Sequence, residues 1–370
     1  MKRILAAILC LIMVVAGVGC AQTATPQATP APAAPADSAA PEATAAPETP
    51  AEPIPLKISH HPYIHGLPSI YAEDNGYYDA FDFTIDMYAS GPVQNEAIPS
   101  GAWEVGTTGM GGAVLGAIGY NLKILGITAG DTNTVDIWVR PDSPLASIAP
   151  DDKGVRGTAD DWRGKTILCA SGTTCHMNLI GTLNHLGLTE KDVNIVDTAV
   201  ASSYTAFAAG EGDIVCLWSP FGFKAESEGL VKVSSVAALG LEMPCLIVCT
   251  EETYNNRRDV VKQWVKAYED SAMALMADPD EAQILFDFET DEGIAVTYEN
   301  CQSEVKARPF YSIDEQAAYF VDNGGTNRLQ DIMREFAQFM VSQGKIKEED
   351  VQKVVDCVDG SIMQELAANQ

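Results

Sequence analysis

Short apolar stretches alternate with helical patterns over the region from residue 55 to about residue 130. Strand-like stretches lie at residues 56–59, 83–88, 103–106 and 122–127. Between them, Pro68 opens a helical pattern that stops at Gly76, and residues 94–98 form a shorter one. This β-α-β-α-β alternation predicts a parallel sheet with helices on its faces.

A second region of the same kind follows. Five further strand-like stretches lie at residues 135–139, 166–169, 194–196, 213–218 and 232–235. Helical patterns at residues 174–186 and 203–209 separate some of them, which predicts a second α/β unit.

A last apolar strand, residues 245–249, leaves this second unit, and helices then dominate. Residues 257–276 carry Val261, Trp264, Val265, Tyr268, Ala272 and Met276 on one helical face. Residues 329–340 carry a similar stripe, from Leu329 to Met340. We interpret both stripes as packing faces of helices on the core.

The first 54 residues have a different character. Lys2 and Arg3 precede an apolar run, residues 4–18, which is too short to span a bilayer and is typical of a secretory signal peptide. Cys20 follows small residues in the manner of a lipobox, so we expect it to be lipidated; a plain signal peptide with a chance cysteine is the alternative. Residues 21–54 are rich in Ala, Pro and Thr and predict an extended tether.

Composition narrows the class of protein further. The formal net charge is −28, which argues against binding to nucleic acid or an electrostatic grip on anionic lipid. Residues 55–370 are too many for one small core and suit two lobes.

Seven cysteines remain beyond Cys20, an odd number, so we expect buried thiols with at most one disulfide. They are Cys169, Cys175, Cys216, Cys245, Cys249, Cys301 and Cys357.

The turn at residues 170–178 is the main candidate for ligand binding. A strand runs through Ser171, Gly172, Thr173 and Thr174 into a helix. Such a turn leaves the first N–H groups of the helix open, and the helix dipole favours an anion there. Cys175 and His176 point about 100° apart on a helix, so they do not form a nucleophile–base pair, and we predict no catalytic residue. His176 remains a candidate hydrogen-bond donor to the anion.

Two other features are candidates for contact with a ligand. His60, His61 and His65 lie in one loop. Three roles remain open for them: hydrogen bonding to a ligand, a purely structural role, and metal binding. No further metal ligand can be placed. Trp218 ends a strand at the rim of the expected cleft. Its ring would stack on a ligand or pack the hinge.

Four segments in order carry a family resemblance. LPSIYAEDNGYYDAFDF, SGAWEVGTTGMGGAV, WRGKTILCASGTTCHMNLIGTLNHLGLTEKDVNIV and AFAAGEGDIVCLWSP resemble consecutive motifs of the taurine, alkanesulfonate, nitrate and thiamine-pyrimidine-precursor (NMT1-like) binding family of ABC importers. The chain departs from the usual pattern at Glu104, where Asp is common, and at Ile214, where Ala is common. The resemblance covers residues 55 to about 275.

The resemblance implies a type II periplasmic-binding-protein fold, with two α/β lobes, two crossovers and a ligand cleft between them. Lobe 1 would be residues 55–135 plus 246–370, and lobe 2 residues 136–245. The implied partners are a small-molecule ligand and an ABC permease, with a lipid anchor on Cys20, a monomeric chain, no cofactor and an extracytoplasmic location. The implied ligand-binding residues are His61, His65, Gly66, Ser90, Gly91, Thr108, Gly109, Gly172, Thr173, Thr174, His176, Ser203, Tyr204 and Trp218.

The ligand class is the least determined part of this prediction. No Lys or Arg lies in the expected contact loops, so an anion such as a sulfonate would be held by helix N-termini, hydroxyls and histidines. A neutral aromatic or pyrimidine ligand would suit Trp218 and Tyr204 equally well. A ligand sensor and an enzyme of pyrimidine synthesis are the competing functions, and the signal peptide argues against the enzyme.

Overall fold

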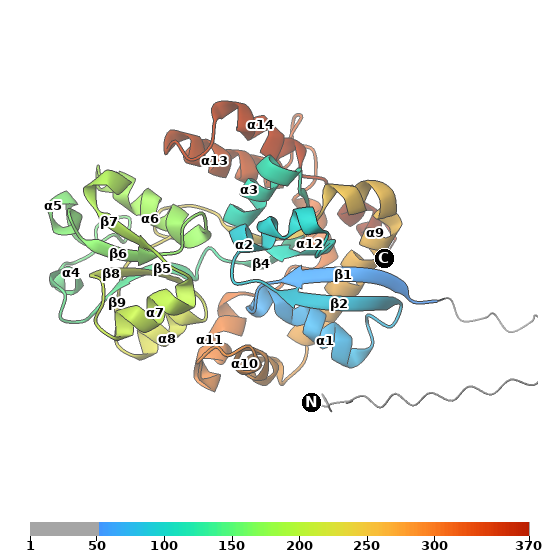
Figure 1. Ribbon diagram of the computed structural model, residues 1–370, viewed down its shortest axis with the longest axis horizontal. Helices are drawn as coiled ribbons and strands as arrows, with labels where there is room; N and C mark the ends of the chain where they lie inside the picture. Colours follow the sequence, from blue (N-terminus) through green and yellow to red (C-terminus); the bar gives the residue numbers. More distant parts are fainter. Residues whose placement is uncertain (1–51, 370) are drawn as a thin grey trace, which may run out of the picture. The chain divides into compact units, whose positions relative to one another are not determined.

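The computed structural model describes residues 52–369, which form two five-stranded sheets with helices around them (Figure 1). The predicted signal peptide, Cys20 and nearly all of the predicted tether lie outside the described residues. Among residues 52–369, no helix combines the length and the apolar character needed to cross a lipid bilayer.

The first sheet has the strand order β2-β1-β3-β10-β4. In that order its strands are Phe81–Met87, Ile54–His60, Val105–Thr108, Pro244–Cys249 and Lys123–Gly130. Strand β1 runs parallel to β2 and β3, whereas β10 runs antiparallel to both β3 and β4. The sequence predicted parallel strands for residues 55 to about 130 and assigned no direction to the strand at residues 245–249. This strand is buried along its whole length, and a continuous apolar run reveals burial without revealing direction.

The second sheet repeats this plan. Its order is β7-β6-β8-β5-β9, and its strands are Asn194–Asp197, Thr166–Cys169, Ile214–Trp218, Val135–Val139 and Val231–Ser235. Strand β6 is parallel to β7 and β8, and β5 is antiparallel to β8 and β9. The chain passes between the sheets at residues 131–134 and again at residues 236–243, because β4 and β5 belong to different sheets, as do β9 and β10.

Helices of the first half of the chain connect these strands. They are α1 (Leu67–Asn75), α2 (Gly91–Glu96), α3 (Met110–Tyr120), α4 (Pro144–Ser147), α5 (Ala159–Trp162), α6 (Thr174–His185), α7 (Val200–Ala208) and α8 (Phe221–Ser227). Three short 3-10 turns are η1 (Ile64–Gly66), η2 (Ile98–Ser100) and η3 (Glu190–Asp192). In Figure 1, α4 to α8 surround the second sheet.

The helices after β10 pack around the first sheet. They are α9 (Glu251–Met276), α10 (Glu281–Asp291), α11 (Tyr298–Ala307), α12 (Ile313–Ala318), α13 (Arg328–Ser342), α14 (Glu348–Asp356) and α15 (Ser361–Ala367). Helix α9 starts about two turns earlier than predicted, because Thr250 caps it there. Arg257, where the prediction put the start, has non-helical backbone angles and marks a kink inside the helix. Its buried face agrees with the predicted stripe except at Met276, which is exposed, whereas Leu275 is buried.

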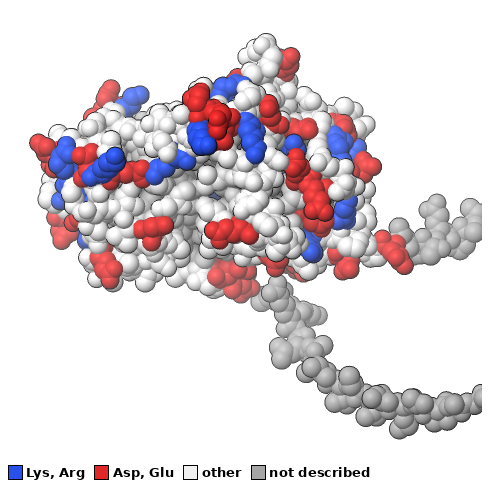
Figure 2. Space-filling model, turned by 45° about the horizontal axis from the view of Figure 1, so that its top comes forward, with Lys and Arg blue, Asp and Glu red and all other residues white. Residues whose placement is uncertain are grey.

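Two surface and core properties bear on function. All seven cysteines within the described residues are free and buried. On the face seen in Figure 2, acidic side chains are interspersed with basic ones rather than gathered into a single patch.

Candidate functional site

A small cavity of about 40 Å³ lies between loops of the first sheet and the turn that precedes α6 in the second. The cavity therefore has room for water or for a compact polar group. The lining residues are His61, Tyr63, His65, Ser90, Gly91, Pro92, Gly109, Gly111, Gly112, Asp131, Thr173, Thr174, Trp218 and Arg308.

Two helices, α3 and α6, begin at this cavity, and residues of both helix starts line it. The N-cap of α3 is Gly109 and that of α6 is Thr173, and neither caps its helix through a side-chain hydrogen bond. The first free backbone N–H groups of each helix therefore surround the cavity, with the positive ends of both helix dipoles. This arrangement favours a negatively charged or acceptor-rich group between them.

Close backbone contact brings these helix starts together. A Cβ atom on Gly111 would lie 2.8 Å from the carbonyl oxygen of Gly172. A Cβ atom on Gly91, at the start of α2, would lie 2.6 Å from the Cα of Gly112. Only glycine tolerates such contacts, which explains Gly111 and Gly112 of the TTGMGG segment.

Aromatic side chains form one wall of the cavity. The ring of Tyr63 meets that of Trp218 edge to face, with ring centroids 5.8 Å apart. The indole nitrogen of Trp218 is buried and has no hydrogen-bond partner within residues 52–369. An unpaired buried N–H group is costly, so this donor is suited to an acceptor atom, either the neighbouring Tyr63 hydroxyl or an atom of a ligand.

Two of the three predicted histidines line the cavity, and both are buried. The ring centroids of His61 and His65 are 5.1 Å apart, and His61 Nε2 lies 3.3 Å from Gln94 Oε1. Burial lowers the pKa of His61 to about 4 and holds the pKa of His65 well below its ordinary value. Both rings are therefore neutral at pH 7 and offer hydrogen bonds rather than charge. The residues that the structure describes include no group of three His, Cys, Asp or Glu side chains arranged for a metal ion.

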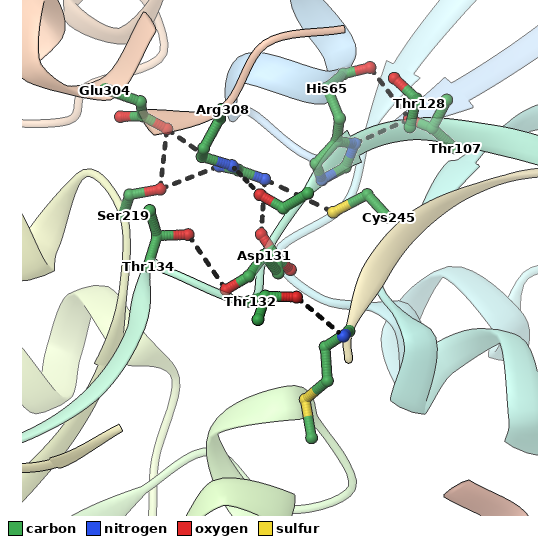
Figure 3. Close-up of polar contacts among 12 residues, drawn as sticks. His65, Thr107, Thr128, Asp131, Thr132, Thr134, Ser219, Cys245, Glu304 and Arg308 are labelled. Atoms are coloured by element: carbon green, nitrogen blue, oxygen red, sulfur yellow. Dashed lines mark hydrogen bonds and ion pairs between the residues drawn. The ribbon is translucent and has the colours of Figure 1, made fainter. Parts of the chain in front are cut away.

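A buried arginine, which sequence reasoning missed, reaches the cavity from the end of α11. Arg308 Nη2 lies 2.6 Å from Asp131 Oδ1, and Nη1 donates to Ser219 Oγ and Glu304 Oε1, each at 2.9 Å (Figure 3). Its remaining hydrogen bonds go to the Gly130 carbonyl and to Cys245 Sγ. All of its nitrogens are thus engaged by the protein, and its charge is balanced by carboxylates.

This arginine network joins both sheets to the crossover. Asp131 lies in the crossover after β4, and Ser219 follows β8 of the second sheet. Ser219 Oγ also donates to Glu304 Oε1 at 2.8 Å. Burial raises the pKa of Glu304 above its ordinary value. Arg308 lies outside the contact loops that the sequence singled out, and it has no N–H group free for an anion.

Comparisons with known proteins agree with this geometry. The family model described as "NMT1/THI5 like" matches residues 64–282. A putative ABC transporter periplasmic binding protein of Brachyspira hyodysenteriae is 32% identical over 314 residues, which cover 83% of this chain and 88% of that protein. The chain belongs to the NMT1/THI5-like family.

Solved structures place this NMT1/THI5-like chain in a known fold. The alkanesulfonate-binding protein SsuA of Xanthomonas axonopodis pv. citri, bound to MOPS, is 18% identical with a TM-score of 0.66, covering 84% of this chain and 99% of that one. The periplasmic nitrate-binding protein NrtA of Synechocystis PCC 6803 is 11% identical with a TM-score of 0.69, covering 86% and 89%. The predicted periplasmic-binding-protein fold, with two α/β lobes, is confirmed.

Eight of the predicted ligand-binding residues line the cavity of this family member. They are His61, His65, Ser90, Gly91, Gly109, Thr173, Thr174 and Trp218. Gly66, Thr108 and Gly172 are not among the lining residues, but each is next in sequence to one that is, namely His65, Gly109 and Thr173. A Cβ on Gly66 would lie 2.7 Å from the His61 carbonyl oxygen. Thr108 is fully buried, and its hydroxyl has no hydrogen-bond partner in the described part of the chain.

The other three predicted residues have protein partners outside the cavity. His176 Nε2 lies 2.7 Å from Glu190 Oε1, and its Nδ1 accepts from the N–H of Gly172. Ser203 donates to the Thr198 carbonyl, and the Tyr204 hydroxyl donates to Glu228. Contact of these three side chains with a ligand stays a prediction.

Six lining residues were not predicted. Tyr63, Pro92, Gly111 and Gly112 lie within segments that the sequence singled out, so a wider choice around each turn would have included them. Asp131 and Arg308 are different, because they come together only through the crossover and the C-terminal helices, and no local pattern marks them.

Proposed function

We propose that this chain captures a small solute between its two lobes and delivers it to an ABC permease. The Brachyspira relative, described as an ABC transporter periplasmic binding protein, supports this role across most of the chain. An extracytoplasmic location, a lipid anchor on Cys20, a monomeric state and the absence of catalytic turnover belong to the same proposal.

For the ligand we propose a compact anionic head, similar to a sulfonate. The observation that carries this is the meeting of two uncapped helix starts, α3 and α6, at one cavity. Their N–H groups and the indole N–H of Trp218 supply donors, while the charge of Arg308 is balanced by Asp131 and Glu304. The negative charge would therefore be met by dipoles and hydrogen bonds.

A neutral pyrimidine or aromatic ligand is the second candidate. The edge-to-face pair of Tyr63 and Trp218 favours it, because these rings supply an apolar wall that a planar ligand could contact. The neutral histidines are compatible with either candidate.

Thermal unfolding with separate ligands tests both candidates. The set contains methanesulfonate, taurine, nitrate and a 4-aminopyrimidine. A ligand at 100 times its Kd stabilises the folded state by about 2.7 kcal/mol, which is a rise in Tm of roughly 5 °C for a chain of this size. A rise with a sulfonate is expected. A rise with the pyrimidine alone would overturn the anionic head but keep the capture role, and no rise at millimolar concentrations would contradict both.

A further inference from the structure

A chain of five buried side chains leads from Tyr78 to the cavity. The Tyr78 hydroxyl lies 2.7 Å from Ser69 Oγ, which lies 2.6 Å from His60 Nε2. The other ring nitrogen of His60, Nδ1, lies 2.7 Å from Thr107 Oγ1, and Thr107 Oγ1 lies 2.7 Å from His65 Nδ1. Of these five residues, His65 alone lines the cavity, and the others are at most 1% exposed.

The hydroxyl of Tyr78 sets the direction of this chain. Each hydroxyl has one hydrogen to donate, and Ser69 is the acceptor within reach of Tyr78. If Ser69 donated to Tyr78 instead, the phenol hydrogen would be buried without an acceptor among the described residues, which is unfavourable. Tyr78 therefore donates to Ser69.

The next hydrogen positions follow. Ser69 donates to Nε2 of His60, so the single proton of the neutral ring is on Nδ1, where it donates to Thr107. Burial lowers the pKa of His60 to about 3, so the ring carries no second proton at neutral pH.

Thr107 has two acceptors to choose from, both on His65. Its hydroxyl lies 2.7 Å from Nδ1 and 3.2 Å from the main-chain carbonyl oxygen of His65. That carbonyl already accepts a hydrogen bond from the Tyr268 hydroxyl at 2.8 Å. The shorter contact, to a nitrogen without another donor, is the better hydrogen bond.

We propose that this relay holds His65 as the neutral Nε2–H tautomer and makes it an uncharged hydrogen-bond donor to the ligand. Figure 3 shows one ring nitrogen of His65 bonded to Thr107 and the other turned away from it, on the side of Arg308. Tyr78, Ser69, His60 and Thr107 are positioning residues, since they act on the ligand only through His65.

The relay gives this part of the cavity a defined preference. His65 Nε2–H and Trp218 Nε1–H are both donors, so the ligand atoms that face them must be acceptors, such as sulfonate oxygens. A ligand that turned an N–H group toward His65 would leave two donors facing each other, and it would bind at least tenfold more weakly.

Nitrogen-15 NMR of the ligand-free, full chain at pH 7 tests the tautomer directly. The chain has five histidines, and the spectrum of His65→Gln identifies the signals of His65. We expect Nε2–H for His65 and Nδ1–H for His60. A spectrum with Nδ1–H at His65 would overturn the proposal, because Thr107 would then donate to the carbonyl.

Two variants test the relay at a distance from the cavity. Tyr78→Phe removes the terminal donor and keeps the ring, so we expect His60 to populate the opposite tautomer. Thr107→Val removes the hydroxyl between the rings and should release His65 from a single tautomer, whereas Thr107→Ser retains the hydroxyl and should leave it unchanged. Unaltered histidine signals in Tyr78→Phe would contradict the claim that Tyr78 sets the direction of the relay, even if Thr107→Val does not fold.

The use of this donor for ligand binding rests on the proposed function, and a separate titration with methanesulfonate tests it. If His65 changes tautomer in a variant, we expect the affinity to fall about tenfold relative to Thr107→Ser. Unchanged affinity would remove the donor role from His65. If the wild-type chain binds no sulfonate but shows the expected tautomers, the sulfonate ligand is wrong and the relay stands.

Discussion

Gly111 and Gly172 lie in direct backbone contact across the two lobes. A Cβ on Gly111 would lie 2.8 Å from the carbonyl oxygen of Gly172 and 3.1 Å from the carbonyl carbon of Thr173. These atoms belong to the main chain, so they cannot move aside as the end of a flexible side chain would. The approach of the α3 and α6 helix starts thus depends on a missing side chain.

The substitution Gly111→Ala should therefore keep the lobes apart. We expect loss of the ligand-induced rise in Tm and a larger radius of gyration in small-angle X-ray scattering. Folding itself should not suffer, because alanine is more favourable than glycine inside a helix by about 1 kcal/mol.

Gly119→Ala is the matched control on the same helix. A Cβ at Gly119 would meet no atom of residues 52–369 within 4 Å, so this variant should bind ligand as the wild type does. Equal behaviour of the two alanine variants would show that the contact at Gly111 does not limit closure.

Replacement of Arg308 by methionine should cost much of the stability. It would leave Asp131 and Glu304 buried without their cation, and breaking a buried pair costs about 3–5 kcal/mol. Urea unfolding measures this loss.

An exposed arginine gives the control. Arg328 pairs with Glu242 near the second crossover, and its side chain is 52% exposed, so Arg328→Met should cost less than about 1 kcal/mol. If both substitutions had similar small effects, the Arg308 network would not be important for stability.

Glu269 makes stability depend on pH in a defined direction. Burial raises the pKa of its carboxyl in the folded chain to about 8, from 4.5. Between these values the folded state holds a proton that the unfolded state has lost, so this contribution to stability falls as the pH rises from about 4.5 to 8. Glu269→Gln should therefore gain stability relative to the wild type over this interval.

The difference in unfolding free energy between wild type and variant isolates this effect. The buried histidines have lowered pKa values and act in the opposite sense, but both proteins contain them. Glu349→Gln, at a side chain that is 75% exposed, should show a constant difference. A constant difference for Glu269→Gln as well would contradict a raised pKa.

Local patterns were sufficient for much of the fold and for part of the cavity. Gly109, Thr173 and Trp218 lie where a strand ends or a helix begins, and such positions are marked by small or aromatic residues beside an apolar run. The same reasoning located the helix faces, apart from Met276.

The rest of the fold and of the cavity depends on contacts between residues that are far apart in the sequence, and no local pattern encodes such contacts. The apolar run of strand β10 indicates that the strand is buried but not which way it points. Its antiparallel place between β3 and β4 could therefore not be deduced. Arg308 joins Asp131, 177 residues earlier in the chain, through packing that only the folded chain creates. Tyr204 was selected for its type and sequence position, yet its hydroxyl is turned toward Glu228.

Native mass spectrometry with added methanesulfonate is the decisive test of an anion site between α3 and α6, because it counts ligands bound to the folded chain. We expect one sulfonate per chain, with the complex lost in Gly111→Ala and retained in Gly119→Ala. A wild-type chain that stays ligand-free at millimolar methanesulfonate, taurine and nitrate would contradict an anion site at the starts of α3 and α6.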